Sequence, residues 1–443
     1  MTLLLLNFKL RSTFSTRVRI IVKKNLNDRR SYHRRPKIIR KIIRKIMRRL
    51  PSTNYKGPRF ELYTRILAWL GSDCKIIPLC DFEAASQPII KIAESCEYFS
   101  ETPSSMGQTP SRHCGEMPAI MGRLFLNACV NSNSSAIVTQ EKIAIPRLYI
   151  EHPSATITDS NFLLSQAHGK GVVLRSDLQS VKSGIAVFGS GSSNWYHWLI
   201  EILPAAFLSE RLSKDYDDFE LMIPEHCIAS GTFRDTIDLF ASTRSRILMP
   251  FGINFNVEKL IGIDPVVVGP MNMQPSQWPE VADYSHNAEI LLAYRAAIID
   301  RLNLTPSRPS RHIFLARNKD RRSFNQSELI EISQRYGFEV VYPERMNFRE
   351  QVQMYLDSSF IVGASGAAFA NILFCQPDTR SLTWLLPQYS GFCAYSNLAN
   401  VVGVKLNYLF VEPLSPINST FDAYSASYIL SPSDFETALK KMT

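Results

Sequence analysis

Residues 360–371 read FIVGASGAAFAN, and this stretch decides the fold class. The apolar run Phe360–Val362 is typical of a strand that is covered on both faces, as in a parallel sheet. Gly363 and Gly366 let the backbone turn sharply and leave room for a ligand. A helix is predicted to follow, and its first N–H groups and its dipole suit a phosphate or diphosphate. The stretch therefore predicts a strand–turn–helix unit of an α/β protein, either with a phosphate site at the carboxyl edge of a sheet or as a tight turn without a ligand.

The chain on both sides of this stretch alternates between predicted strands and helices. Before it, we expect strands at 185–188, 219–223, 247–249 and 260–263, with helices at 195–209 and 232–240. After a boundary near 265–279, we expect strands at 313–316, 338–341, 360–363 and 382–386, with helices at 288–302, 325–336, 347–357 and 368–374. Two of these helices are expected to begin with capping boxes, because Asn325 and Asn347 are each followed three residues later by a glutamate.

This alternation predicts an α/β fold with two Rossmann-like halves that face a cleft, each a parallel sheet with helices on its faces. The expected segments are an arm (1–50), a first half (51–265), a second half (266–430) and a C-terminal helix (431–443).

The net charge is unevenly distributed along the 443 residues. Residues 1–50 contain 17 Lys or Arg and one acid, whereas the other 393 carry 33 basic and 39 acidic side chains. The mildly acidic body argues against a nucleic-acid-binding protein. The eight cysteines form no C-x-x-C pair, which is typical of free thiols in a reducing compartment. No stretch reaches the ~20 apolar residues of a transmembrane helix, so a cytoplasmic protein is expected.

The basic arm contains an amphipathic segment. Residues 37–50 read KIIRKIIRKIMRRL, and Pro36 stands at a natural first helical position. At about 100° per residue, the isoleucines form one face and the Lys and Arg residues the other. The pattern predicts a helix on an anionic membrane surface, where each basic residue contributes about 1 kcal/mol. The alternatives are packing on the body, a disordered arm, and nucleic-acid binding, against which the lack of stacking aromatics argues.

A histidine and a carboxylate follow the glycine-serine turn at 189–194. His197 and Glu201 are four residues apart near the start of a predicted helix, so they share one face. A histidine beside a carboxylate is suited to act as a general base, because its pKa lies near working pH. Asn194 is placed to cap the helix. The structural alternative is a packed histidine without a chemical role.

Charged side chains are also expected at the carboxyl edge of the second sheet. Arg311 and Arg317 bracket the predicted strand 313–316, and Arg317 falls at its carboxyl end. Guanidinium groups bind diphosphate oxygens in bidentate fashion. Arg322 precedes the next helix, and Glu344 follows the next strand. A solvated basic loop is the alternative.

Several well-known motifs are absent from the sequence. There is no Walker A sequence and no Gly-x-Ser-x-Gly elbow, and residues 189–194 lack the third glycine of the dinucleotide fingerprint. The D-x-D at 215–217 lies between a predicted helix and a predicted strand, so a solvated turn is expected there.

Four motifs, taken in order, resemble glycosyltransferase family 61, in particular its bacterial members associated with capsular polysaccharide synthesis. Residues 194–204 are similar to the family's N-x-Y-H-W-L-x-E-x-L-P pattern, and residues 311–325 to its arginine strand and R-R-x-x-N step. Residues 344–351 resemble E-x-M-[S/N]-F-x-E-Q, and residues 363–374 resemble G-x-H-G-A-x-x-x-N-x-x-F. Each motif is weak alone, but four in this order are specific.

The resemblance implies a GT-B fold and inverting transfer from a nucleotide-sugar donor to an acceptor hydroxyl, with no cofactor and no metal at the diphosphate. The first half would hold the acceptor and the second the donor. The implied catalytic residues are His197 and Glu201, supported by Asn194 and Tyr196. The implied donor-binding residues are Arg311, Arg317, Arg322, Glu344, Ser365, Gly366, Ala367 and Asn371.

The chain departs from the family pattern at two positions. Ser365 replaces the usual histidine before Gly-Ala, and Thr383 stands where an acid is often found. The expected function is a glycosyltransferase, cytoplasmic and peripheral on the inner face of the cell membrane, that extends a lipid-linked cell-surface polysaccharide. The alternative is a non-catalytic GT-B-fold protein that binds a nucleotide or a glycan.

Overall fold

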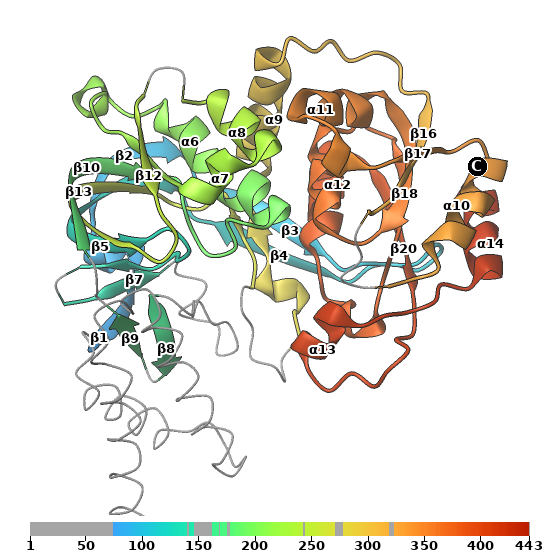
Figure 1. Ribbon diagram of the computed structural model, residues 1–443, viewed down its shortest axis with the longest axis horizontal. Coiled ribbons are helices and arrows are strands. Elements are labelled where there is room, and N and C mark those ends of the chain that lie inside the picture. The colour runs from blue at the N-terminus through green and yellow to red at the C-terminus, as the bar shows by residue number, and fades with distance from the viewer. Residues whose placement is uncertain are drawn as a thin grey trace, which may run out of the picture. The chain divides into compact units, whose positions relative to one another are not determined.

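The computed structural model describes residues 74–139, 141–145, 162–167, 169–174, 178–241, 244–270, 278–318 and 323–442. Residues 77–443 form one compact unit. In the described residues, the main sheets have 11 and five strands, and helices lie on their faces (Figure 1). The protein therefore has an α/β fold, as the sequence predicts.

The five-stranded sheet is parallel throughout and has the order β17-β16-β18-β19-β20, so the direction of winding reverses between β16 and β18. Along β18, Phe360 and Val362 pack into one apolar cluster and Ile361 into another. This is the two-sided burial that the apolar run predicts. The strands are β16 (Arg311–Leu315), β17 (Glu339–Val341), β18 (Ser358–Ala364), β19 (Arg380–Leu385) and β20 (Lys405–Phe410). The helices of this half are α10 (Gln326–Arg335), α11 (Phe348–Asp357), α12 (Ala394–Val402) and α14 (Pro432–Met442).

The 11-stranded sheet has a parallel part with the order β12-β11-β10-β13, which reverses its winding between β10 and β13. Strand β13 then pairs antiparallel with β5. These strands are β5 (Ile120–Asn131), β10 (Leu178–Ala186), β11 (Leu221–Pro224), β12 (Arg246–Met249) and β13 (Asn254–Ile263). The others are β1 (Cys74–Asp81), β2 (Gln87–Ala93), β6 (Ile137–Val138), β7 (Ile143–Ile145), β8 (Leu163–Ala167) and β9 (Lys170–Leu174).

One apolar core is shared by the helices of both sheets. Trp198, Phe207, Tyr294 and Phe374 belong to it, and the Tyr294 hydroxyl donates to the carbonyl oxygen of Leu199 at 3.0 Å. The carboxyl ends of the two parallel arrays are therefore held by continuous packing. The contributing elements include η2 (His197–Ile202), α6 (Pro204–Ser209), α8 (Gly231–Asp238), α9 (Ala288–Arg301) and η6 (Ala367–Phe374).

The single helix predicted over 195–209 is instead two short helices. Element η2 is a π-helix, in which the Leu203 N–H donates to the carbonyl of Trp198, five residues earlier, at 2.8 Å. Pro204 then begins α6 and has no N–H to continue the ladder. Single π turns occur frequently at functional sites, and this one carries His197 and Glu201.

One of the two predicted capping boxes is confirmed. The Glu350 N–H donates to Asn347 Oδ1 at 2.9 Å, and the Asn347 N–H donates to Glu350 Oε2 at 2.8 Å. The box at Asn325 was wrong. Its side-chain amide instead pairs with the backbone of Leu430, accepting at 3.1 Å and donating at 3.0 Å, so it anchors the segment that leads into α14.

A hairpin that the sequence analysis did not predict packs beside the second sheet. Strands β3 (Cys96–Glu101) and β4 (Arg112–Met117) are antiparallel. Ser100 Oγ donates to the Tyr284 carbonyl at 2.7 Å and accepts from Asn397 Nδ2 of α12 at 3.0 Å. This hairpin therefore links α12 to the segment that carries Tyr284.

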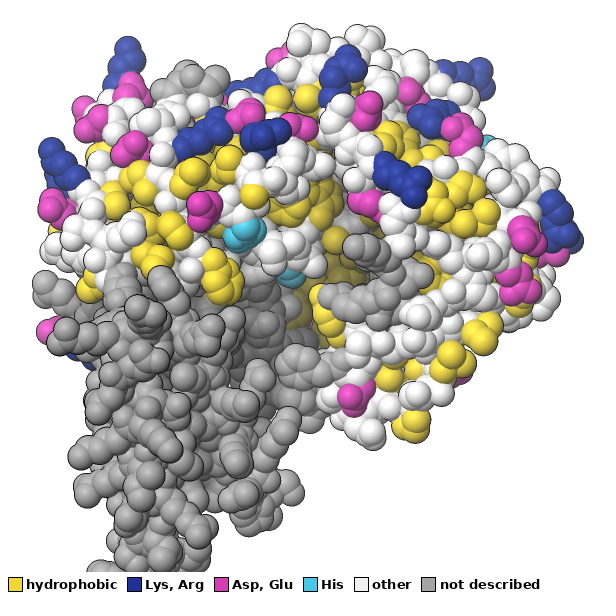
Figure 2. Space-filling view, in the orientation of Figure 1, with side chains coloured by type: hydrophobic (Ala, Val, Ile, Leu, Met, Phe, Trp, Pro, Cys, Tyr) yellow, Lys and Arg dark blue, Asp and Glu magenta, His cyan; other side chains and the backbone are white. Residues whose placement is uncertain are grey.

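Some predictions fall outside the described residues, namely the arm 1–50 with its helix at 37–50, and Arg322. No helix in the described ranges is long and apolar enough to cross a bilayer. The cysteines from Cys80 to Cys393 are free thiols. On the face drawn in Figure 2, Lys and Arg side chains are interspersed with Asp and Glu rather than gathered into one basic patch.

Candidate active site

The first part of the site lies where the winding of the five-stranded sheet reverses. Arg317 follows β16 and Ser365 follows β18, so both lie at the carboxyl edge, where open α/β sheets bind ligands. Arg317 Nη2 donates to the carbonyl oxygens of Ala364 and Ser365, at 2.9 and 2.5 Å. These bonds hold a guanidinium group against the turn that the sequence singled out.

Gly363 and Gly366 matter because the missing side chain leaves space, and not because the backbone has an unusual conformation. Gly366 has extended backbone, with φ at 176°, and neither glycine lies in the left-handed region, so the sharp turn that was predicted does not rest on a conformation reserved for glycine. A Cβ at Gly363 would lie 2.8 Å from the Cβ of Leu315 on the neighbouring strand, and one at Gly366 would overlap the Arg317 guanidinium. The helix that follows, η6, is a 3-10 helix whose first helical hydrogen bond runs from the Phe369 N–H to the Gly366 carbonyl at 2.9 Å, so the N–H groups of Ala367 and Ala368 come before the helical ladder.

The second part of the site is the pair of side chains on the π-helix. His197 Nδ1 and Glu201 Oε2 are 2.7 Å apart, as their shared face predicts. The His197 side chain is 27% exposed and that of Glu201 12%, so the pair is shielded yet still reachable. Because Nδ1 is bound to the carboxylate, Nε2 is the ring nitrogen left for a ligand.

The carboxylate decides the charge of the histidine. Burial disfavours the charged imidazolium and is the largest single influence on His197. The negative charge of Glu201 and its hydrogen bond act in the opposite direction and together outweigh burial, so the pKa of His197 is raised above 6.5. A histidine whose charged form is stabilised by a neighbouring carboxylate suits proton transfer.

An aromatic wall connects the two parts. Ring centroids are 5.7 Å apart for His197–Tyr196 and for Tyr196–Tyr395, 5.3 Å for Tyr395–Phe392 and 6.1 Å for Phe392–Tyr389. Burial raises the pKa of Tyr284 on the same wall, so its phenol stays neutral. Faces of this kind can stack against a base or a sugar ring.

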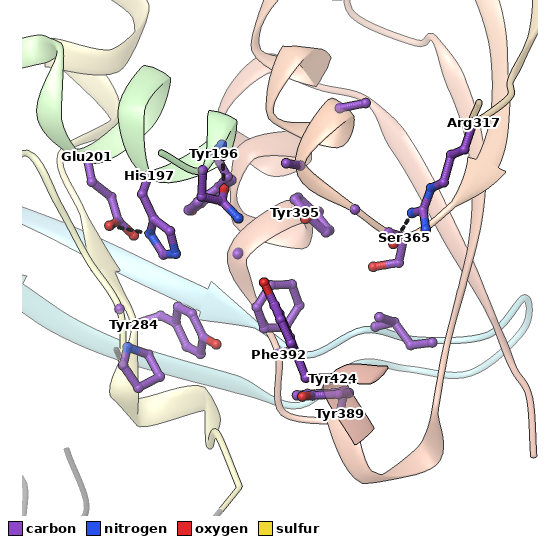
Figure 3. Close-up of a pocket in the computed structure, with 18 residues that line it drawn as sticks. Tyr196, His197, Glu201, Tyr284, Arg317, Ser365, Tyr389, Phe392, Tyr395 and Tyr424 are labelled. Carbon is purple, nitrogen blue, oxygen red and sulfur yellow. Dashed lines mark hydrogen bonds and ion pairs between the residues drawn. The ribbon is translucent and has the colours of Figure 1, made fainter. Parts of the chain in front are cut away.

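These groups surround one cavity of about 330 Å³. Figure 3 shows His197 and Glu201 on one side, Arg317 and Ser365 on the other, and the aromatic rings between and below them. The cavity is also lined by Asn194, Tyr196, Gly366 and Ala367, so most of the predicted residues meet here. Asn194 Oδ1 accepts from the Tyr196 N–H at 2.9 Å and fixes the start of the helix.

Sequence reasoning missed most of the aromatic wall. Tyr284 follows the short helix η4 (Val281–Asp283), and Tyr424 lies on α13 (Thr420–Ser425). Tyr389, Phe392 and Tyr395 belong to the segment YSGFCAY that follows β19. Its aromatic content, directly after a predicted strand, was the signal that could have placed it at the carboxyl edge.

Three predicted donor-binding residues do not line the cavity. Arg311 is the first residue of β16, so it lies at the opposite end of the strand from Arg317, and it pairs with Glu339 at 2.8 Å. Glu344 lies in η5 (Pro343–Arg345), and its Oε1 accepts from the Asn318 N–H at 2.9 Å. Asn371 is the third.

The side chain of Asn371 has a structural role instead. It is fully buried, its Oδ1 accepts from Trp195 Nε1 at 2.8 Å, and its Nδ2 donates to Gln351 Oε1 at 2.8 Å. Because both polar atoms of the amide are used, Asn371 joins η6 to the residue that precedes Tyr196. It therefore shapes the cavity indirectly, by fixing helices from both sheets.

Two further positions bear on the predicted chemistry. Thr383 is buried, and its hydroxyl donates to the carbonyl of Gly363 at 2.9 Å, so it links β19 to β18. The acidic residues Asp215, in the short helix η3 (Lys214–Tyr216), and Asp217, which ends it, are both exposed, as the predicted solvated turn requires. Across the described ranges, no group of three or more His, Cys, Asp or Glu side chains is placed to hold a metal ion.

The cavity therefore combines a histidine–carboxylate pair, a guanidinium beside a turn, and aromatic surfaces. This set can take a proton from a nucleophile on one side and stabilise a developing anion on the other. A search of curated proteins found no match. The family model described as Glycosyltransferase 61 matches residues 195–382, which include His197, Glu201, Arg317 and Ser365. Over these residues, the chain is similar to glycosyltransferase family 61.

Proposed function

We propose that this glycosyltransferase moves a sugar from a nucleotide-sugar to a hydroxyl of a growing, lipid-linked cell-surface polysaccharide. The family implies a nucleotide-sugar donor and a glycan acceptor. Inversion, a GT-B arrangement of the two sheets and an absence of metal at the diphosphate are part of the proposal. The observation that carries it is that one cavity joins the His197–Glu201 pair to Arg317 at the turn after β18.

In the proposed reaction, His197 Nε2 accepts the proton of the acceptor hydroxyl while its oxygen attacks the anomeric carbon of the donor. Glu201 holds Nδ1–H, which fixes the tautomer and stabilises the imidazolium that forms. The bond from the anomeric carbon to the diphosphate breaks, and its electron pair leaves with the nucleoside diphosphate. If Glu201 were the base instead, Glu201→Gln would remove the base itself and not only its partner. The effect of this variant on kcat therefore distinguishes the two assignments.

Arg317 and the first turn of η6 would stabilise the leaving diphosphate. The guanidinium carries a permanent charge, and its bonds to Ala364 and Ser365 fix it beside the helix start. Preorganised donors of this kind stabilise charge without rearrangement during the reaction. They supply positive charge that a metal ion would otherwise provide.

The pH dependence of transfer should report the His197–Glu201 pair. Below its raised pKa, His197 is protonated and cannot accept a proton, so kcat should fall as pH drops through a value above 6.5. In Glu201→Gln the carboxylate is lost and burial remains, so the pKa of His197 should fall. The acidic limb of the profile, where kcat decreases, should then move to lower pH. The measurement is kcat against pH for both proteins. An acidic limb at the same pH in Glu201→Gln would contradict His197 as the base.

The proposal is tested by titrating nucleoside diphosphates and nucleotide-sugars into the full chain and into Arg317→Ala by calorimetry. We expect one nucleotide to bind and the variant to bind it at least tenfold more weakly. Failure of the whole panel to bind would reject the nucleotide-sugar site.

A non-catalytic binding protein is the second candidate. Ser365 lines the cavity without carrying a charge, and the hydroxyl of Thr383 is already bonded to Gly363. This candidate predicts donor binding without turnover. The sequence of residues 37–50 further supports the proposal that the protein lies on the cytoplasmic face of an anionic membrane, near a lipid-linked acceptor.

A further inference from the structure

A second cavity lies at the carboxyl edge of the 11-stranded sheet, where its winding reverses between β10 and β13. It has a volume of about 100 Å³ and is bordered by Phe188 and Ser190 after β10 and by Ile263 and Pro265 at the end of β13. The reversal point of an open α/β sheet is where ligands bind. Each of the two sheets therefore has a cavity at its own reversal point.

Glu201 lines both cavities. Its Oε2 is bound to His197, and its Oε1 lies 4.0 Å from the position that a Cβ on Gly269, in the first cavity, would occupy. Glu201, the carboxylate partner of the proposed base His197, therefore borders both the first cavity, which Arg317 and the aromatic wall also line, and the second cavity.

The walls of the second cavity are mostly apolar. Phe82, Ala186, Ile202 and Ala205 contribute to them. The two serines nearby are already engaged with each other, because the Ser190 N–H donates to Ser135 Oγ at 3.0 Å and the Ser135 N–H donates to Ser190 Oγ at 3.2 Å. An apolar group suits this space better than water does. A cavity of about 100 Å³ has room for a small apolar substituent such as the methyl of an acetamido group.

A third cavity adjoins the second. It measures about 90 Å³ and shares Phe82, Pro265 and Val268 with the second. Its polar wall contains Asp81, Glu83 and the ion pair Arg123–Asp264, in which Nε and Oδ1 are 2.7 Å apart. Glu201 thus borders the first and second cavities, and the third cavity, which adjoins the second, has carboxylates that can accept hydrogen bonds from sugar hydroxyls. The second and third cavities together are called the path below.

We propose that this path binds the acceptor glycan, and that the sugar that receives the new residue carries an apolar substituent beside its reacting hydroxyl. The methyl of an acetamido group or of a 6-deoxy sugar would fill the second cavity, and the preceding sugar would contact Asp81, Glu83 and Arg123. This inference rests on the proposed function, since it needs an acceptor hydroxyl at the His197–Glu201 pair.

The test measures binding of three methyl glycosides to the full chain by NMR titration, namely those of N-acetylglucosamine, rhamnose and glucose. We expect one of the first two to bind about tenfold more tightly than the glucoside, the discrimination that one methyl group gives in an apolar pocket. Ala205→Leu and Ala186→Val fill the cavity from two walls and should abolish this preference. The matched control Ala297→Leu, on α9, should keep it. Equal binding of all three glycosides, or an unchanged preference in both filled variants, would overturn the inference.

Nucleoside diphosphate binding, measured on the same samples, separates this inference from the proposed function. Because the donor groups lie across the first cavity, the filled variants should bind the nucleotide as the wild type does. If the nucleotide binds but no methyl glycoside is preferred, only the inference fails. If no nucleotide binds, the proposed function fails, and the glycoside titration still shows whether the second cavity recognises a sugar.

Discussion

Replacing His197 with alanine should lower the rate of sugar transfer by about 10²–10⁴-fold, the range that a positioned general base contributes. The imidazole lies 2.7 Å from Glu201 and has no second histidine beside it among the residues that line the cavity. Donor binding should change little, because Arg317 and Ser365 lie across the cavity from it. The measurements are kcat and the donor Kd for the wild type and the variant.

Two further variants control this experiment. Glu201→Gln keeps the shape of the side chain and should reduce kcat less than His197→Ala does, because it removes the partner of the base and not the base. His113→Ala, on strand β4 and outside the lining of the cavity, should leave kcat unchanged. A His197→Ala protein that transfers within threefold of the wild-type rate would exclude His197 as the base.

Replacing Arg317 with alanine should lower kcat by about 10²–10³-fold, the cost of removing one preorganised donor from a developing anion. The loss should exceed that of an ordinary surface charge because the guanidinium is fixed by the Ala364 and Ser365 carbonyls. Donor affinity should fall as well. Arg317→Lys should recover only part of the loss in kcat and of the loss in donor affinity, since an ammonium group lacks the planar pair of N–H donors of a guanidinium group.

Arg311→Ala is the matched control for this prediction. Arg311 and Arg317 bracket one strand, yet Arg311 forms an exposed pair with Glu339, with side chains 34% and 52% exposed. Exposed pairs contribute about 0–1 kcal/mol, so this variant should transfer at nearly the wild-type rate. If Arg311→Ala lost as much activity as Arg317→Ala, the placement of the donor site at the carboxyl edge would be wrong.

The parts of the site that could be predicted are those fixed by local pattern. An apolar run such as 360–362 indicates a strand buried on both faces, and the residues just after it must then lie at the carboxyl edge. That rule placed Arg317 and Ser365 correctly. The four-residue spacing of His197 and Glu201 likewise brought their side chains together, even though the helix is of the π type.

The parts that could not be predicted depend on long-range packing. Tyr284 and Tyr424 lie far apart in the chain and meet at one cavity only because both sheets pack into a common core. Asn371 matches a family motif, but whether its amide faces a ligand or Trp195 is decided by a tertiary contact. Arg311 was assigned to the donor site by its motif, although its place at the start of β16 separates it from Arg317.

The measurement that tests the central claim most directly is nucleotide release from a panel of nucleotide-sugars by the purified full chain, with and without EDTA. The panel is repeated with Arg317→Ala and His197→Ala, and with methyl glycosides as acceptors. The account predicts release from one donor that is stimulated by an acceptor, insensitive to EDTA and strongly reduced in both variants. Release that is unaffected by either substitution would contradict it, because the chemistry would then not occur in this cavity.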